Sequence, residues 1–168
     1  PGLRRRFSCE SWNAIDRKIF NDERQRAFDM IRRDAPFEAQ GYDIDPTAIE
    51  LTLSNARKAG VESRVKAACQ PIEQLHFERE RALIICNPPY GERLLDRKQA
   101  HELYRQMGKV FGRLDTRKYV ISPSEEFEQL YGKPADRRRK LYNGMIRCQL
   151  FCYNGKKHPD APREDEKK

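Results

Sequence analysis

The sequence predicts an α/β protein: an open sheet with layered helices, closed at its C-terminal end by an antiparallel hairpin. Three observations support this fold class. β-rich runs alternate with segments whose apolar residues recur at helical spacing. The run at 81–87 is almost entirely apolar, as expected for a strand covered on both faces of a parallel sheet. Asn143-Gly144, a strong hairpin signal, lies between two β-rich flanks.

The N-terminal third predicts an amphipathic helix, then a strand and a second helix. Apolar residues at roughly helical spacing run from 12 to 33, and 37–45 is a short strand that stops in acidic residues. Pro46 suits the first turn of a helix over 46–60, and Gly60 is a natural terminus for it. The residues expected to lie largely inward on this helix are Ile49, Leu51, Leu53 and Ala56.

The rest of the chain continues the alternation. The expected elements are strands at 63–70, 81–87 and 117–122, helices at 97–113 and 123–132, and the hairpin around Asn143-Gly144. On the helix at 97–113, the apolar side consists of Leu103, Tyr104, Met107, Val110 and Phe111.

The length and composition are those of one domain with a modest core and a heavily charged surface. The chain has 168 residues, of which 38% are apolar and 36% charged. No apolar run reaches 18 residues and no secretory signal is visible, so no membrane association is expected. The five cysteines lack CxxC spacing and the three histidines lie far apart, so no metal site is expected. These features predict a reduced, cytoplasmic protein.

The net charge of +8 favours an anionic partner such as nucleic acid. The positive residues cluster at 4–6, 32–33 and 137–140. Arginine suits phosphate because its guanidinium is a planar fork of donors. Each cluster could equally be a solvated surface, so charge alone leaves both interpretations open.

Polar residues follow the predicted strands at their carboxyl ends, where open α/β sheets bind ligands. They are Asp43, Asp45, Gln70, Asn87 and Tyr90. The carboxylate of Asp43 suits the two hydroxyls of a ribose. Asp45 stands at a helix N-cap position, which aspartate favours for structural reasons alone. Gln70 either pairs with an adenine edge or simply ends its strand.

The turn Asn87-Pro88-Pro89-Tyr90-Gly91 is unusually stiff. Each proline fixes its own φ near −65° and biases the preceding residue towards extended geometry. The two prolines also remove two backbone N–H groups, which leaves the carbonyls of Asn87 and Pro88 as a cluster of acceptors on a rigid support. Such acceptors could hold the exocyclic amine of a nucleobase, and Tyr90 offers a flat face for the base to stack on. The structural alternative is an ordinary turn, which asparagine often forms.

These residues carry a family resemblance. Asn-Pro-Pro-Tyr at a strand end resembles the motif of S-adenosylmethionine-dependent methyltransferases that act on amines of nucleobases or of glutamine. Its longer form, NPPYGERL at 87–94, resembles the bacterial ribosomal RNA guanine-N2-methyltransferases of the RlmL type. GYDIDPTAIELTLSNARKAGV is similar to that family's second nucleotide-binding segment, and KLYNGMIRCQLFCY to its closing hairpin. EEFEQLYGKPADRRRKLYNG is similar to the Gram-positive branch.

The resemblance covers about residues 1–154 and implies a Rossmann-like class I methyltransferase sheet with helices on both faces. It implies that Asp43, Asp45, Gln70 and Asn87 bind S-adenosylmethionine, with Asp43 on its ribose. It also implies that Asn87 and the Pro88–Pro89 backbone hold the target amine while Tyr90 stacks on the base. Transfer would then be direct and in line, so no covalent nucleophile is needed and the cysteines can be structural.

The sequence departs from the family at its N-terminal end. The family's Asp-Pro-x-Cys-Gly-[Ser/Ala]-Gly-Thr strand and loop does not occur, so 1–154 is expected to be the C-terminal part of a catalytic domain that lacks its first strand and glycine-rich loop. Residues 155–168 are expected to be a charged, disordered tail. We expect the isolated 168 residues to bind S-adenosylmethionine weakly or not at all; micromolar binding by calorimetry would contradict this.

Three functions are compatible with these features. The resemblance favours methyl transfer to the N2 amine of a guanine in large-subunit ribosomal RNA. An N6-adenine or protein-glutamine methyltransferase shares the Asn-Pro-Pro-Tyr motif. A non-catalytic RNA-binding fragment would keep the basic surface without the cofactor loop. The sequence leaves open which guanine is the target, whether free RNA or a ribosomal subunit is the substrate, and the oligomeric state.

Overall fold

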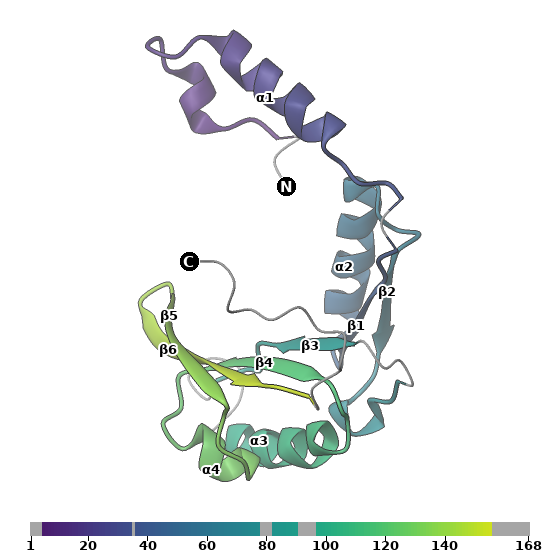
Figure 1. Cartoon of the computed structure of the whole chain (residues 1–168), viewed down its shortest axis with the longest axis vertical. Coiled ribbons are helices and arrows are strands. Elements are labelled where there is room, and N and C mark those ends of the chain that lie inside the picture. Colours follow the sequence, from purple (N-terminus) through teal and green to yellow (C-terminus); the bar gives the residue numbers. More distant parts are fainter. Residues whose placement is uncertain (1–4, 35, 78–81, 91–96, 156–168) are drawn as a thin grey trace. The chain divides into compact units, whose positions relative to one another are not determined.

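The computed structural model describes residues 5–34, 36–77, 82–90 and 97–155 (Figure 1). The residues cluster into two compact units, Pro1–Cys69 and Gln70–Lys168, which are taken in turn. The family extension at 91–94 and the predicted tail from 156 onwards lie outside the described residues.

The N-terminal unit begins with a short 3-10 helix, η1 (Ser8–Ser11), and the helix α1 (Arg17–Asp29). The predicted helix at 12–33 is therefore shorter, because Asp16 caps it: its side chain accepts a hydrogen bond from the Lys18 backbone at 2.8 Å. No residue of α1 is buried, and Ile19 and Phe28 are about half exposed. The expected amphipathic helix forms, but its apolar side is open to solvent.

A two-stranded parallel sheet completes this unit. β1 (Ala39–Asp43) pairs with β2 (Val65–Cys69), and α2 (Pro46–Ala59) connects them and packs on both. Pro46 occupies the first turn of α2, and Gly60 ends it with a φ of +71°, which glycine adopts without strain. Of the four residues expected to lie inward, Ala56 is buried, but Leu51 is 60% exposed and its expected placement is wrong.

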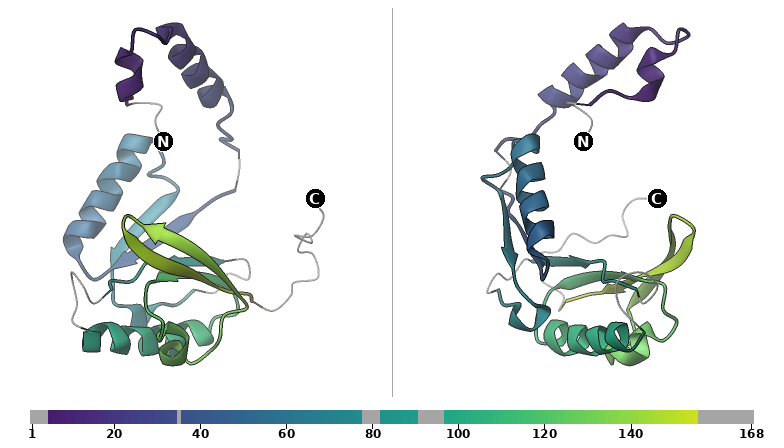
Figure 2. Two further views of the ribbon diagram at one scale, coloured as in Figure 1. Left: turned by 90° about the vertical axis from the view of Figure 1, so that its left-hand side faces the viewer. Right: turned by 180° about the vertical axis from the view of Figure 1, so that it is seen from behind.

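The C-terminal unit has a four-stranded sheet in the order β3-β4-β6-β5. β3 (Leu83–Cys86) and β4 (Arg117–Ser122) are parallel, whereas β6 (Ile146–Tyr153) runs antiparallel to both β4 and β5 (Arg137–Asn143). The helix α3 (Arg97–Gly112) and the short helix α4 (Phe127–Tyr131) lie together on one face (Figures 1 and 2). A 3-10 turn, η2 (Ile72–Gln74), packs beside α3.

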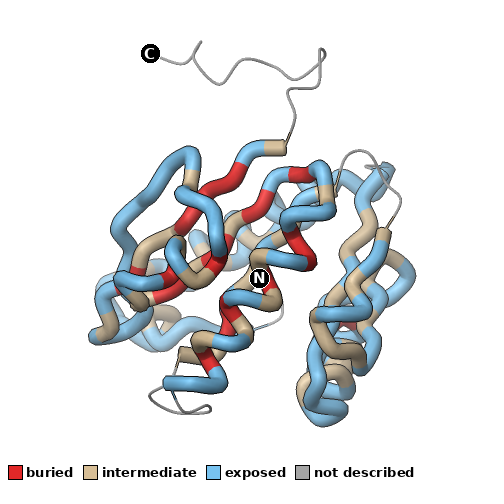
Figure 3. The backbone as a smooth tube through the Cα atoms, turned by 90° about the horizontal axis from the view of Figure 1, so that it is seen from below, coloured by how far each residue is buried: buried red, intermediate tan, exposed pale blue. Residues whose placement is uncertain are grey.

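The core of the C-terminal unit lies between this sheet and its two helices (Figure 3). An aromatic stack runs through it: the ring of Phe127 lies 4.5 Å from Phe151 and 5.4 Å from Tyr131, and Tyr131 lies 4.6 Å from Tyr153. The apolar side predicted for α3 supplies four buried residues, Tyr104, Met107, Val110 and Phe111. The alternation of strands and helices is confirmed in this unit.

One expectation about β3 is wrong. Its apolar sequence predicts a strand covered on both faces, but Leu83 and Ile85 are 53% and 77% exposed. The alternate residues Ile84 and Cys86 pack against the core under α3. Because successive side chains of a strand point to opposite faces, the described residues of the C-terminal unit cover only the α3 face of β3.

Candidate active site

The Asn87–Tyr90 turn leaves the end of β3, as the sequence predicts. Pro88 is buried, Pro89 and Tyr90 are partly buried, and Asn87 is exposed. The apolar prolines therefore anchor the turn while the amide of Asn87 faces solvent. Within the described residues the peptide bonds are all trans, so the stiffness comes from the two fixed φ angles alone.

The hydroxyl of Tyr90 links two amides. It donates a hydrogen bond to Asn87 Oδ1 at 2.5 Å and accepts one from Asn143 Nδ2 at 3.3 Å. Burial raises the pKa of Tyr90, and the hydrogen bond from Asn143 opposes that rise. The hydroxyl is therefore protonated at neutral pH, as its role as donor to Asn87 requires.

This arrangement holds the Asn87 side-chain carbonyl in one orientation. An amide oxygen has two lone pairs, and Tyr90 uses one of them. The second, with the backbone carbonyls of the turn, remains available to accept from an N–H donor. An arrangement of this kind can bind an amine through neutral acceptors, without proton abstraction by a strong base.

Cys86 precedes Asn87, and its thiol is not activated as a nucleophile. Burial raises the pKa of its thiol to about 11. The thiolate is the reactive form of cysteine, so this residue is almost wholly unreactive at neutral pH. The turn therefore supplies positioning groups and no activated sulfur.

The acidic residues at the end of β1 lie in the N-terminal unit. Asp43 is exposed, and its Oδ1 accepts a hydrogen bond from the Asp45 backbone at 2.9 Å. Asp45 in turn accepts from the Thr47 backbone at 2.8 Å, which caps α2. Asp43 thus has a second carboxylate oxygen with no hydrogen-bond partner among the described residues, which fits a ribose hydroxyl, whereas Asp45 already performs its structural role as a helix cap.

Gln70 directly follows Cys69, the residue of β2 that lies opposite Asp43 in the strand register. Its side chain is partly buried and makes no hydrogen bond to another described side chain or backbone group. An amide in that state can serve an adenine edge, as the sequence suggests, and no described contact assigns it another task.

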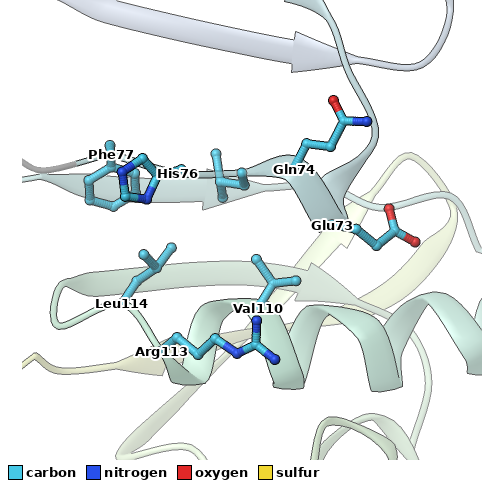
Figure 4. Close-up of a pocket in the computed structure, with 8 residues that line it drawn as sticks. Glu73, Gln74, His76, Phe77, Val110, Arg113 and Leu114 are labelled. Atoms are coloured by element: carbon cyan, nitrogen blue, oxygen red, sulfur yellow. The ribbon is translucent and has the colours of Figure 1, made fainter.

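A pocket of about 430 Å³ lies elsewhere in the C-terminal unit, between the segment after η2 and the end of α3 (Figure 4). His76 and Phe77 line one side of it, and Val110, Arg113 and Leu114 line the other. No residue of the Asn87–Tyr90 turn contributes to it. The pocket is therefore separate from the predicted site.

The structure brings together Asn87 and Tyr90 and adds Asn143, which the sequence presents only as a turn former. The sequence does single out this residue, because Asn143 precedes Gly144 in the predicted hairpin turn. Its contact with Tyr90 spans 53 residues of sequence and depends on the hairpin register, which no local pattern encodes.

In the described part of the chain, no three histidine, cysteine or acidic side chains are grouped as metal ligands would be. None of its helices has the length and apolarity that crossing a membrane requires.

Comparison with known proteins identifies a family and several relatives of this chain. The model of a family described as an RMKL-like methyltransferase domain matches residues 1–151. YpsC of Bacillus subtilis, provisionally named an RNA methyltransferase, is 31% identical over 98% of this chain and 43% of its own length. The ribosomal RNA large subunit methyltransferase K/L of Legionella pneumophila (strain Paris) is 32% identical over 98% of this chain and 24% of its own.

Solved structures agree on the fold. A "possible methylase" from Clostridium difficile 630 is 41% identical, with a TM-score of 0.83 over 97% of this chain and 43% of that one. SMU.472, named as a methyltransferase and solved with SAH, is 34% identical, with a TM-score of 0.84 over 94% and 42% of the two chains. A protein from Listeria monocytogenes, titled as an N6-adenine-specific DNA methylase, is 37% identical, with a TM-score of 0.80 over 92% and 40%.

The chain therefore spans less than half the length of these relatives. The similarity shows a class I methyltransferase fold of the Rossmann-like type.

Proposed function

Since this chain belongs to the RMKL-like methyltransferase domain family, we propose that it methylates the N2 amine of a guanine in large-subunit ribosomal RNA. One observation of the structure carries the proposal: the stiff Asn87–Tyr90 turn presents an oriented amide oxygen on a proline support. The K/L name of the Legionella relative supports ribosomal RNA as the substrate. The SAH bound to SMU.472 supports S-adenosylmethionine as the cofactor.

The residues of the turn act by binding and orientation. Asn87 Oδ1 and the Pro88 carbonyl each accept a hydrogen bond from one N–H group of the target amine. Pro89 holds the backbone in place. The nitrogen lone pair then lies away from these acceptors and is free to attack. The face of Tyr90 stacks on the guanine, which limits rotation of the base.

The residues assigned to the cofactor are Asp43, Asp45, Gln70 and Asn87. Asp43 would hold the ribose hydroxyls, with Asp45 supporting it through its backbone N–H, and Gln70 would pair with the adenine edge. S-adenosylmethionine supplies a methyl group on a sulfonium, which is a good leaving group. The amine proton is lost to water after transfer, since the turn contains no strong base.

The substrate implies where the reaction takes place: ribosomal RNA is available in the cytoplasm, and no metal or membrane partner is needed. The N6-adenine amine is the second candidate target, because the Listeria relative is titled as a DNA methylase and the Asn-Pro-Pro-Tyr turn suits either amine.

Transfer of tritium from labelled S-adenosylmethionine distinguishes these targets. We expect the intact protein to label large-subunit ribosomal RNA, with the label recovered as N2-methylguanosine after nuclease digestion. Label in DNA or in N6-methyladenosine would favour the second candidate. RNA binding without label would favour a non-catalytic RNA-binding protein.

Replacement of Asn87 tests the site itself. Asn87→Ala in the intact protein removes the oriented acceptor, so methyl transfer should fall by at least about 10²-fold, as misplacement of a reacting group typically causes. RNA binding should persist. Asn55→Ala, at an exposed position of α2, is the matched control and should leave transfer unchanged. Normal transfer by Asn87→Ala would refute the catalytic assignment.

A further inference from the structure

The β5–β6 hairpin extends beyond the sheet from which it grows. β4 pairs with β6 as far as Ser122 opposite Gln149, and the rest of the hairpin towards Gly144 is paired only within itself. In all three ribbon views the tip bends away from α3 and α4, towards the other face of the sheet (Figures 1 and 2). The hairpin therefore presents one face that the helices of this unit do not cover.

Strand alternation separates the four basic residues at 137–140 into two sets. Arg138 lies opposite Phe151, whose ring packs on Phe127 in the core, so Arg138 is on the helix face. Arg137 and Arg139 lie opposite Cys152 and Leu150 and so point to the other face, which is called the open face below.

The two sets differ in charge balance. Arg138 Nε donates to Glu128 Oε1 at 2.9 Å and forms an ion pair with the same carboxylate, so α4 neutralises it. Arg137 and Arg139 are exposed, and neither has an ion-pair partner within the described residues. A run that is uniform in sequence thus leaves two uncompensated guanidinium groups on the open face.

The open face of the hairpin contacts the Asn87–Tyr90 turn through Asn143. Asn143 lies on the same face, since it is an even number of residues from Arg137 and Arg139, and it donates to the Tyr90 hydroxyl. At about 3.4 Å per residue, the backbone of Arg139 is roughly 14 Å and that of Arg137 roughly 20 Å from Asn143. These are distances over which the nucleotides next to a base held at Tyr90 extend.

The tip also carries an aromatic side chain, on the opposite face. Tyr142 is 63% exposed, and the ammonium of Lys140 lies 5.2 Å from the centre of its ring. Because Lys140 and Tyr142 are an even number of residues from Arg138, both side chains belong to the helix-side face of the hairpin and not to its open face.

We propose that the open face of the β5–β6 hairpin binds the single-stranded RNA that flanks the target nucleotide, through Arg137 and Arg139 on phosphates. This inference rests on the proposed function for the identity of the nucleic acid. It adds that the hairpin is both part of the active site, through Asn143, and the surface that delivers the substrate to it.

The test uses the intact protein and a short fluorescent single-stranded RNA, with binding measured by anisotropy over roughly 50 to 200 mM salt. The double variant Arg137→Gln/Arg139→Gln should bind roughly tenfold more weakly, and the slope of log affinity against log salt should fall by about 1.4, since two phosphate contacts are lost. Tyr142→Ala, on the opposite face of the same hairpin, should leave both the affinity and the slope unchanged.

Arg105→Gln/Lys109→Gln is the matched control: it removes the same charge from exposed positions of α3, on the helix side of the sheet. It should bind RNA as the wild type does. Equal losses in both double variants, or wild-type binding by the hairpin variant, would overturn the inference.

Methyl transfer separates this inference from the proposed function. If the wild type methylates RNA and the hairpin variant binds and methylates equally well, the inference fails and the function stands. If the hairpin variant loses RNA binding but even the wild type transfers no methyl group, the surface is confirmed and the function fails. A wild type that does not bind RNA overturns both.

Discussion

Tyr90 lies between two amides: its hydroxyl donates to Asn87 and accepts from Asn143. The sequence suggests only a stacking role for this ring. The structure adds a second role, in which the hydroxyl orients the acceptor that is proposed to hold the target amine. The two roles belong to different parts of the side chain, so substitutions can separate them.

Tyr90→Phe keeps the ring and removes the hydroxyl. Methyl transfer should fall about 2- to 10-fold, as the loss of a neutral hydrogen bond predicts, and the change should appear in kcat because the orientation of Asn87 is relaxed. Tyr90→Ala also removes the stacking face, so KM for RNA should rise roughly 5- to 100-fold. Steady-state kinetics on both variants measures this. Identical kinetics for the two variants would mean that the ring does not stack.

At the scale of elements, the contact between α3 and α4 depends on one glycine. A Cβ at Gly108 would lie 2.0 Å from the carbonyl oxygen of Tyr131, an overlap with backbone that no rotamer can relieve. The helices can therefore approach this closely only because position 108 has no side chain.

Gly108→Ala should lower the free energy of unfolding by about 3 kcal/mol or more, since α4 must move and the aromatic stack on Phe127 moves with it. Gly112→Ala is the control at the end of the same helix, where an added Cβ meets nothing within 4 Å. It should be neutral or stabilising by up to about 1 kcal/mol. Urea unfolding of both variants gives the comparison, and equal stabilities would contradict the packing argument.

At the scale of the whole molecule, the buried core is unevenly distributed. Among the described residues, the only buried side chain of the N-terminal unit is Ala56, whereas the C-terminal unit contains the aromatic cluster. Local stability follows buried apolar contacts, so the two units should open at different free energies.

Hydrogen exchange tests this difference with two helices of similar length. α2 has 14 residues with one buried, and α3 has 16 with five buried. The amides of α3 should exchange markedly more slowly than those of α2. Equal protection in the two helices, measured on the intact protein, would show that the N-terminal unit gains stability from contacts beyond its own core.

The thiol of Cys86 and the phenol of Tyr131 predict a loss of stability at alkaline pH. Burial raises the pKa of Cys86 to about 11, from an ordinary value of 9.0, and that of Tyr131 to about 12, from 10.0. The folded state favours the neutral forms of both groups. Below pH 9.0 both groups are neutral in the folded and the unfolded chain, so their ionisation does not reduce the free energy of unfolding. Above pH 9.0 the unfolded chain ionises first, and the free energy of unfolding falls as pH rises towards 11 and 12.

Urea midpoints at pH of about 8 and about 10.5 measure this decline. Cys86→Ala should be less stable at the lower pH but lose less on going to the higher one. An unchanged pH slope in that variant would show that the thiol of Cys86 does not contribute to the decline.

The sequence by itself determined the alternation of strands and helices, the positions of most elements to within a few residues, and the stiff Asn87–Tyr90 turn. These features depend on neighbours along the chain: helical spacing, caps at Asp45 and Gly60, and the fixed φ angles of prolines. The family resemblance belongs here too, since it rests on contiguous motifs.

Only the tertiary structure decided which residues meet. It brought Asn143 to Tyr90, neutralised Arg138 but not Arg137 and Arg139, and within the C-terminal unit covered only one face of β3. Each of these depends on strand register and on the close approach of elements distant in sequence. A shift of one residue in the hairpin would exchange its two faces, which is why a uniform basic run could not reveal which of its residues lie on the open face.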